Sequence, residues 1–236
     1  MRHNLVDIRK LLLSSIPLLE RISTESIKKI ERHAKRLNFV KGQEIIARSQ
    51  ELNDVYILVQ GLARVLVFSA NGKAVGFRRI SPGDLFGEFA AIDGDRRSAS
   101  VEAVTNCVVV CMSSNFFREL MESDPVFMNA VLNHLVGMLR GLTARIVEFS
   151  TLAVKNRIHS EIVRMARDTK DGKGGFLISP APTHAEIAQR ISTHREAVSR
   201  EISRLKQLGI IERRGRALAV MNLARLERMV EEASGE

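Results

Sequence analysis

The segment from Phe86 to Ser100, FGEFAAIDGDRRSAS, combines residue types that could bind a small charged ligand. Small residues such as Gly87 let the backbone approach a ligand closely, and free amides at the start of a short helix can hold an anion. An arginine pairs with a phosphate and a serine adds a donor, whereas a carboxylate only accepts and therefore suits sugar hydroxyls. The combination predicts a cyclic-nucleotide site. The competing interpretation is a surface loop whose arginines, Arg96 and Arg97, lie in water.

No catalytic group accompanies this segment. It lacks the Gly-Lys-Ser/Thr ending of the phosphate-binding loop of ATPases, and the sequence offers no nucleophile–base pair, metal constellation or catalytic carboxylate pair. Cys107 and Cys111 lie four residues apart in a strand-like run, on one side but too far apart to bond. We expect two buried or half-buried free thiols in a reducing cytosol, no metal, and a protein that is not an enzyme.

A second polar group, near the C-terminus, lies on a pair of predicted helices within residues 182–211, PTHAEIAQRISTHREAVSREISRLKQLGII. Two capping boxes predict helices over about 184–191 and 194–207, and Gly209 is expected to end the second. Two short helices joined by a tight turn are typical of a helix-turn-helix. The two boxes are Thr183 with Glu186 and Thr193 with Glu196.

One face of the second predicted helix could contact DNA bases. Arginine suits the O6 and N7 acceptors of guanine, and glutamate can accept from the amino group of cytosine. Thr183, at the start of the first helix, is a further candidate for a DNA contact. The competing interpretation is a solvated charged face with internal ion pairs. The candidates near the N-terminus of the second helix are Arg195, Glu196, Ser199 and Arg200.

The residues after these helices predict a wing. Ile210 and Ile211 and then Ala217 to Val220 indicate two strands, joined by a turn of Arg213, Arg214, Gly215 and Arg216. Arginines in such a turn, here Arg214 and Arg216, can reach phosphates. A last helix, about 223–233, is expected only to pack against the rest.

The elements that position the first site are β-strands. Residues 37–120 contain four β-rich runs separated by turn signals, which suggest an antiparallel barrel or roll. Asn71-Gly72 is a hairpin signal, and short helices are expected within residues 1–36. The four runs are DVYILVQG, LARVLVFS, AVGFRRI and SVEAVTNCVVVCM.

A long helix is predicted over about 124–152, starting at Asp124-Pro125. Its apolar residues step by three or four, and this stripe needs a partner. The partner is either the chain's own barrel or the same helix in a second copy of the protein. The stripe consists of Val131, Leu135, Met138, Leu142, Ile146 and Phe149.

The chain is basic. Its net charge of +9 suggests a polyanionic partner, such as nucleic acid or an anionic membrane, and 5% aromatic residues without tryptophan disfavour a surface that stacks single strands. No apolar run approaches the ~20 residues of a membrane span, so the cytoplasm is expected and no membrane partner. The expected fold class is α+β, with a β-roll and long helix over 1–152 and a winged helix-turn-helix over 153–236.

The segment GDLFGEFAAIDGDRRSASVEA resembles the phosphate-binding cassette of cyclic-nucleotide-binding domains. With the helix-turn-helix, the chain resembles the Crp–Fnr family of bacterial transcription regulators from about residue 15 to 222, and most closely its cAMP receptor protein branch. The resemblance implies a β-roll, a long dimerising helix and a winged helix-turn-helix. It also implies double-stranded DNA, a second copy of the chain and RNA polymerase as partners.

The same resemblance implies roles for cassette residues. Gly87 matches the first glycine, Glu88 the acid that binds the ribose 2′-hydroxyl, and Arg97 the arginine that pairs with the cyclic phosphate. Ser98 matches the hydroxyl beside that arginine. The cassette is one residue shorter than in the best-known enteric member. Two further residues, whose backbone lines the phosphate and sugar, are Phe89 and Ala90.

Outside the cassette, Thr143 matches a hydroxyl that touches the base. Arg195, Glu196 and Arg200 match the base-reading residues of the cAMP receptor branch, which implies a palindrome with half-sites like TGTGA. We expect cAMP as the ligand, with cGMP as a second one because Ser98 could accommodate the amino group of guanine.

We therefore predict a homodimeric regulator that binds DNA when a cyclic nucleotide shifts its population of states, with a hinge near residues 150–154. Two alternatives remain. The same architecture could sense another signal, such as redox state or haem, or none. Alternatively, the chain could be a cyclic-nucleotide-binding regulatory subunit that acts on a protein partner.

Overall fold

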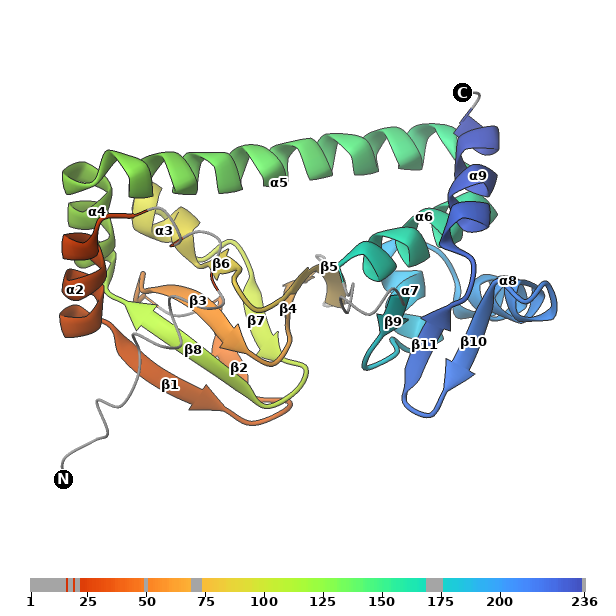
Figure 1. Ribbon diagram of the computed structural model, residues 1–236, viewed down its shortest axis with the longest axis horizontal. Coiled ribbons are helices and arrows are strands. Elements are labelled where there is room, and N and C mark those ends of the chain that lie inside the picture. The colour runs from red at the N-terminus through yellow and green to blue at the C-terminus, as the bar shows by residue number, and fades with distance from the viewer. Residues whose placement is uncertain are drawn as a thin grey trace. The chain divides into compact units, whose positions relative to one another are not determined.

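Figure 1 shows the computed structural model of the chain, which describes residues 16, 19, 22–48, 51–68, 74–168 and 176–234. The chain divides into two compact units, residues 1–139 and 140–236. The long helix α5 (Pro125–Thr151) contributes residues to both. The predicted hairpin at Asn71-Gly72 and most of the predicted N-terminal helices lie outside the described residues.

The first unit contains the predicted β-roll. Two four-stranded antiparallel sheets have the strand orders β1-β8-β3-β6 and β2-β7-β4-β5. The last β-rich run of the sequence forms two strands, β7 and β8, separated by residues 104–106. The strands are β1 (Lys35–Phe39), β2 (Glu44–Ile46), β3 (Val55–Gln60), β4 (Ala63–Phe68), β5 (Ala74–Ile80), β6 (Leu85–Phe86), β7 (Ser100–Ala103) and β8 (Cys107–Met112).

Strand β3 is apolar on both faces because it separates two hydrophobic clusters. Val55, Ile57 and Val59 pack with the helices, whereas Tyr56 and Leu58 pack inside the roll. This alternation follows from the two-residue repeat of a strand. On the neighbouring strand β8, the two cysteines belong to the cluster inside the roll and are free, buried thiols, as the sequence predicted.

Helices α2 (Thr24–His33), α3 (Glu88–Asp93) and α4 (Ser114–Ser123) accompany the roll. Helix α5 starts at Pro125 as predicted. Asp124 caps it, because its Oδ1 accepts from the amides of Val126 and Phe127, at 2.9 and 3.1 Å. Its Oδ2 accepts from the Ser26 hydroxyl at 2.6 Å, which fastens α2 to the same point. Burial raises the pKa of this carboxyl, but these hydrogen bonds outweigh burial and hold the pKa below its ordinary value.

The apolar residues of α5 do not form the single stripe that the sequence predicted. Val131 is fully buried in the first unit's own core and Leu135 packs against that core, whereas Ile146 is 67% exposed. A separate stripe lies about 100° around the helix from the core-facing side, because successive residues advance by about 100°. Its apolar members are exposed: Leu132, Val136, Leu139 and Ile146.

The second unit contains the predicted winged helix-turn-helix (Figure 1). Its core is formed by α6, α7, α8, the wing and α9, whose Leu226 is fully buried. The wing has three strands, in the order β10-β11-β9, and β9 was not predicted. The turn of the wing is shorter than predicted, since Arg213 and Arg214 belong to β10. The elements are α6 (Val154–Arg167), β9 (Phe176–Ile178), α7 (His184–Arg190), α8 (Arg195–Gln207), β10 (Ile211–Arg214), β11 (Ala217–Val220) and α9 (Leu223–Ser234).

One of the two predicted capping boxes is formed. Thr183 caps α7 with a reciprocal bond to Glu186. The expected box of Thr193 with Glu196 is wrong, because α8 is capped by His194 without a side-chain bond. Ser192 adopts a positive φ of 51° in the turn, and the helix begins one residue later than expected. Glu196 therefore stands at the second helical position rather than the third.

Candidate functional site

Helix α3 begins directly after β6, and Gly87 makes this junction possible. Its φ is 81°, in the left-handed region that favours glycine. A Cβ at this position would lie 2.9 Å from Nη1 of Arg97 and 3.0 Å from the backbone oxygen of Asp54. The backbone and the arginine approach each other so closely that no side chain fits between them.

Arg97 is a buried cation whose orientation is fixed by the backbone. Only 4% of it is exposed. Its Nη1 donates to the carbonyl of Gly87 at 2.8 Å and its Nη2 to the carbonyl of Asp54 at 2.7 Å. Its Nε is buried and has no hydrogen-bond partner among the described residues. Two carbonyls therefore hold the guanidinium in place, while its positive charge and one buried donor stay available.

Arg97 keeps its positive charge in spite of burial. Burial lowers the pKa of Arg97, whereas the electrostatic influence of Tyr56, Asp54, Cys111 and Glu88 raises it. A guanidinium stays protonated in proteins in spite of such shifts. Tyr56 acts on the pKa of Arg97 but is itself uncharged. Burial and the nearby Cys111 and Asp54 raise the pKa of Tyr56 to about 12, so its phenol stays neutral.

The other cassette residues differ in exposure. Glu88 is 4% exposed and Ala90 is buried, whereas Phe89 is 46% exposed and Ser98 is exposed as well. Glu88 lies close enough to Arg97 to act on its pKa. The predicted cassette residues are therefore gathered around α3, with the carboxylate and guanidinium buried beside each other. Thr143 lies on α5 within the second unit, and its contact with a nucleotide stays a prediction.

One residue of this site, His134, was not predicted from the sequence. The Nε2 atom of His134, on α5, lies 3.7 Å from Oε1 of Glu88. The helical pattern could have placed His134 beside the core, because it follows the buried Val131 by three residues and precedes Leu135. No sequence motif linked it to Glu88, which lies on another element.

In the second unit, α8 presents its predicted DNA-reading residues to solvent. Val198, Ile202 and Leu205 are buried against the core of the unit. On the opposite face, Arg195, Glu196 and Arg200 are exposed, and the described part of the chain gives them no hydrogen bond or ion pair. The competing interpretation of internal ion pairs on this face does not hold for these three residues.

Ser199, the fourth predicted residue on α8, is engaged within the protein. Its hydroxyl lies 2.7 Å from Nδ1 of His184, the first residue of α7. Burial and the positive charges of Lys206, Arg195 and Arg213 lower the pKa of His184, so its ring is neutral near pH 7 and can pair with the hydroxyl. Ser199 thereby ties the two helices of the motif together. Thr183, beside His184, is exposed.

The wing carries the two arginines that were predicted to contact phosphates, and their surroundings differ. Arg214 forms an ion pair of 3.1 Å with Glu212, and both side chains are more than half exposed. Arg216 is exposed in the turn. An exposed pair of this kind contributes little free energy, so Arg214 can exchange it for a phosphate.

A buried pair holds α8 on α6. His159 is fully buried, and its Nε2 lies 2.7 Å from Oε1 of Glu201, which also accepts from Arg204 at 3.0 Å. Burial lowers the pKa of His159, and the hydrogen bond and charge of Glu201 offset only part of this effect. The neutral ring therefore donates from Nε2 to the carboxylate.

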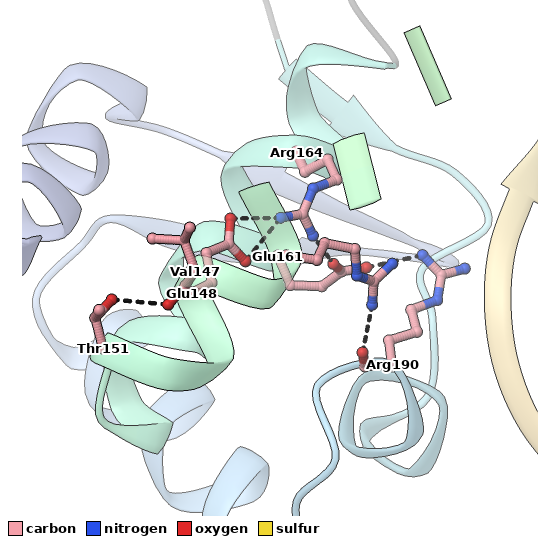
Figure 2. Close-up of polar contacts among 7 residues, drawn as sticks. Val147, Glu148, Thr151, Glu161, Arg164 and Arg190 are labelled. Atoms are coloured by element: carbon pink, nitrogen blue, oxygen red, sulfur yellow. Dashed lines mark hydrogen bonds and ion pairs between the residues drawn. The ribbon is translucent and has the colours of Figure 1, made fainter. Parts of the chain in front are cut away.

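A network of ion pairs joins the end of α5 to α6 and α7 across the predicted hinge (Figure 2). Glu148 of α5 accepts from Arg164 of α6 at 2.7 and 2.9 Å. The buried Glu161 of α6 accepts from Arg164 and, at 3.0 Å, from Arg190. Arg145 donates to the backbone carbonyl of Arg190, the last residue of α7. The last turns of α5 are therefore fastened to the turn that precedes α8.

Two protein-family models match this chain, one in its N-terminal part and one in its C-terminal part. Residues 36–124 match the cyclic nucleotide-binding domain, and residues 156–229 match the Crp-like helix-turn-helix domain. This chain belongs to the Crp–Fnr family. It is a transcription regulator of the cyclic-nucleotide-binding type and not an enzyme.

Relatives of this Crp–Fnr protein are similar over most of their length. It is 28% identical to the transcriptional regulator LdrP of Thermus thermophilus over 190 residues, 80% of this chain and 94% of that protein. It is 26% identical to the cAMP-activated global transcriptional regulator CRP of Salmonella typhimurium over 179 residues, 75% of this chain and 84% of that protein. The structure of FixK2 from Bradyrhizobium japonicum has the same fold, with a TM-score of 0.73 at 20% identity over 83% of this chain and 96% of that one.

The described part of this Crp–Fnr protein shows neither a metal-ligand cluster nor a candidate membrane span. Among the described residues, no three or more His, Cys, Asp or Glu side chains are grouped so that they could hold a metal ion. None of the described helices is both long and apolar enough to cross a membrane.

Proposed function

We propose that this protein is a homodimeric transcription regulator that cAMP, and secondarily cGMP, switches to bind a palindrome with TGTGA-like half-sites. Arg97 carries the proposal. It is a buried guanidinium held by two backbone carbonyls, and its Nε has no partner among the described residues. A cyclic phosphate would supply the charged acceptor that this Nε lacks.

The proposed switch is a shift in population. The nucleotide pairs with Arg97 and Ser98 through its phosphate and with Glu88 through its ribose, while Thr143 contacts its base. The ion-pair network around Glu161 could carry the effect of nucleotide binding from α5 to α8, because it connects the end of α5 to the turn before α8. Nucleotide and DNA should therefore strengthen each other's binding.

The exposed stripe of α5 supports a dimer on a palindrome. It has the four–three spacing of a coiled-coil seam and includes Thr143. Its five members are Leu132, Val136, Leu139, Thr143 and Ile146. A second copy would cover this stripe and bring two α8 helices to half-sites about one helical turn apart. The proposed place of action is the cytoplasm, with RNA polymerase as a further partner.

The test is binding of the full chain to a labelled TGTGA palindrome at fixed salt, without nucleotide, with cAMP and with cGMP. We expect tight binding only with nucleotide, and cAMP more effective than cGMP. Equal binding in all three conditions would contradict the switch and favour the same architecture with another signal. Nucleotide binding without DNA binding would favour a regulator that acts on a protein partner.

A pair of variants tests the nucleotide site separately. Arg97→Leu should weaken nucleotide binding by ~2–5 kcal/mol, because the phosphate loses its buried cationic partner. Arg96→Leu is the matched control, since Arg96 is the exposed neighbour of Arg97. Calorimetric titration measures both, and unchanged affinity in Arg97→Leu would overturn the assignment of the site.

A further inference from the structure

His134 and Glu88 present polar atoms to one point from two different elements. The Nε2 atom of His134, on α5, lies 3.7 Å from Oε1 of Glu88, on α3, and the side chains are 15% and 5% exposed. That Nε2 atom is buried and has no hydrogen-bond partner among the described residues. A buried polar atom without a partner is rare in a native protein and calls for an explanation.

The position of His134 on α5 explains why its ring points inward. Val131, three residues earlier, is fully buried, and Leu135, one residue later, packs against the same core. His134 therefore lies at the border of the core-facing side of α5. Its neighbour Asn133 is exposed.

The chemistry of the two groups fits one hydroxyl that bonds to both. Their separation is longer than a hydrogen bond, but a single oxygen atom could bond to both. A carboxylate only accepts, and an imidazole Nε2–H donates. A hydroxyl group satisfies both partners, because it donates to Glu88 and accepts from His134. In a 3′,5′-cyclic nucleotide the ribose has one free hydroxyl, at the 2′ position.

We infer that His134 is a second ribose-binding residue, which shares the 2′-hydroxyl of a cyclic nucleotide with Glu88. The inference rests on the proposed function and extends it to the long helix. Ribose recognition is then divided between α3 and α5, so the bound nucleotide contacts the same helix that carries the exposed stripe. A ligand that lacks the hydroxyl leaves the Nε2 atom of His134 without a partner.

The experiment measures calorimetric affinities of the full chain for cAMP and for 2′-deoxy-cAMP. The variants are His134→Leu, which removes the donor, and His134→Gln, whose amide nitrogen can replace Nε2. Asn133→Leu is the control for adding a leucine to α5. His134→Leu should weaken cAMP binding about ten-fold, the effect of one buried hydrogen bond, and 2′-deoxy-cAMP binding less than about two-fold. His134→Gln should recover most of the loss, and Asn133→Leu should match the wild type.

The outcomes separate the inference from the proposed function. If the wild type binds neither cAMP nor cGMP, the proposed function fails and the inference fails with it. If the wild type binds cAMP and His134→Leu weakens both ligands equally, His134 is only structural and the inference alone is wrong. Unchanged or tighter cAMP binding by His134→Leu also overturns it, since the ring would then contribute nothing to ribose binding or would oppose it.

Discussion

Some charged residues of α8 form ion pairs within the protein, and others do not. Glu201 and Arg204 are paired with each other, and Glu201 also bonds to His159. Arg195 and Arg200 are exposed, and the described residues offer them no ion pair. A cation without an internal partner breaks no ion pair of the protein when it contacts a base or phosphate. This difference supports base reading by Arg195 more directly than the helical pattern does.

Arg195→Ala should weaken binding to the TGTGA palindrome by ~1–3 kcal/mol and relax the preference at one base position. Arg225→Ala is the matched control, because it removes the same charge from an exposed position on α9. Binding to a set of palindromes, each with one base pair changed, measures both effects. An Arg195→Ala protein with unaltered sequence preference would show that this residue contacts only phosphates.

At the scale of the elements, sequence patterns predicted the longer strands of the roll, the long helix and the helix-turn-helix, because each has its own periodicity and turn residues. They missed the strands β1, β2, β6 and β9, and they failed where two apolar patterns overlap on one helix. On α5 one apolar face packs on the roll and another is exposed, and Ile146 belongs to the exposed one. Periodicity could not separate the faces without the core that covers one of them. The pairing of His134 with Glu88 was equally hidden, because it depends on how α5 packs beside α3.

The contact between α6 and α8 predicts a pH dependence of stability. His159 has a pKa below its ordinary value because it is buried, whereas in the unfolded chain it takes up a proton near pH 6.5. Below that pH the unfolded state binds more protons than the folded state, so the free energy of unfolding falls as the pH falls toward the folded pKa. Urea unfolding followed by circular dichroism at pH 7.5 and pH 5.5 measures this loss.

The His159→Gln variant assigns the effect to one residue. Glutamine keeps a donor for Glu201 but has no titrating group. The urea midpoint of this variant should therefore change less between pH 7.5 and pH 5.5 than the midpoint of the wild type. His184 also has a lowered pKa and acts in the same direction. Part of the acid sensitivity should therefore persist. An equal change in wild type and variant would mean that His159 does not contribute.

At the scale of the whole molecule, the exposed stripe of α5 predicts how the regulator assembles. Leu139 lies at its centre and is 63% exposed. An exposed apolar seam of this length on one helix would favour aggregation of an isolated chain. A second copy of the helix is the partner whose stripe has the same spacing. A charge at the centre of the seam should prevent assembly, because it would be buried without a partner.

Leu139→Glu should therefore convert a dimer into a monomer in sedimentation velocity, whereas Asn133→Glu, on the same helix but about 100° away from the stripe, should not. The monomer should keep the contacts of Glu88 and Arg97 with the nucleotide. It should lose roughly 100-fold or more in affinity for the palindrome, because the second recognition helix no longer binds at high effective concentration. If Leu139→Glu stays dimeric and binds DNA normally, another surface joins the two copies.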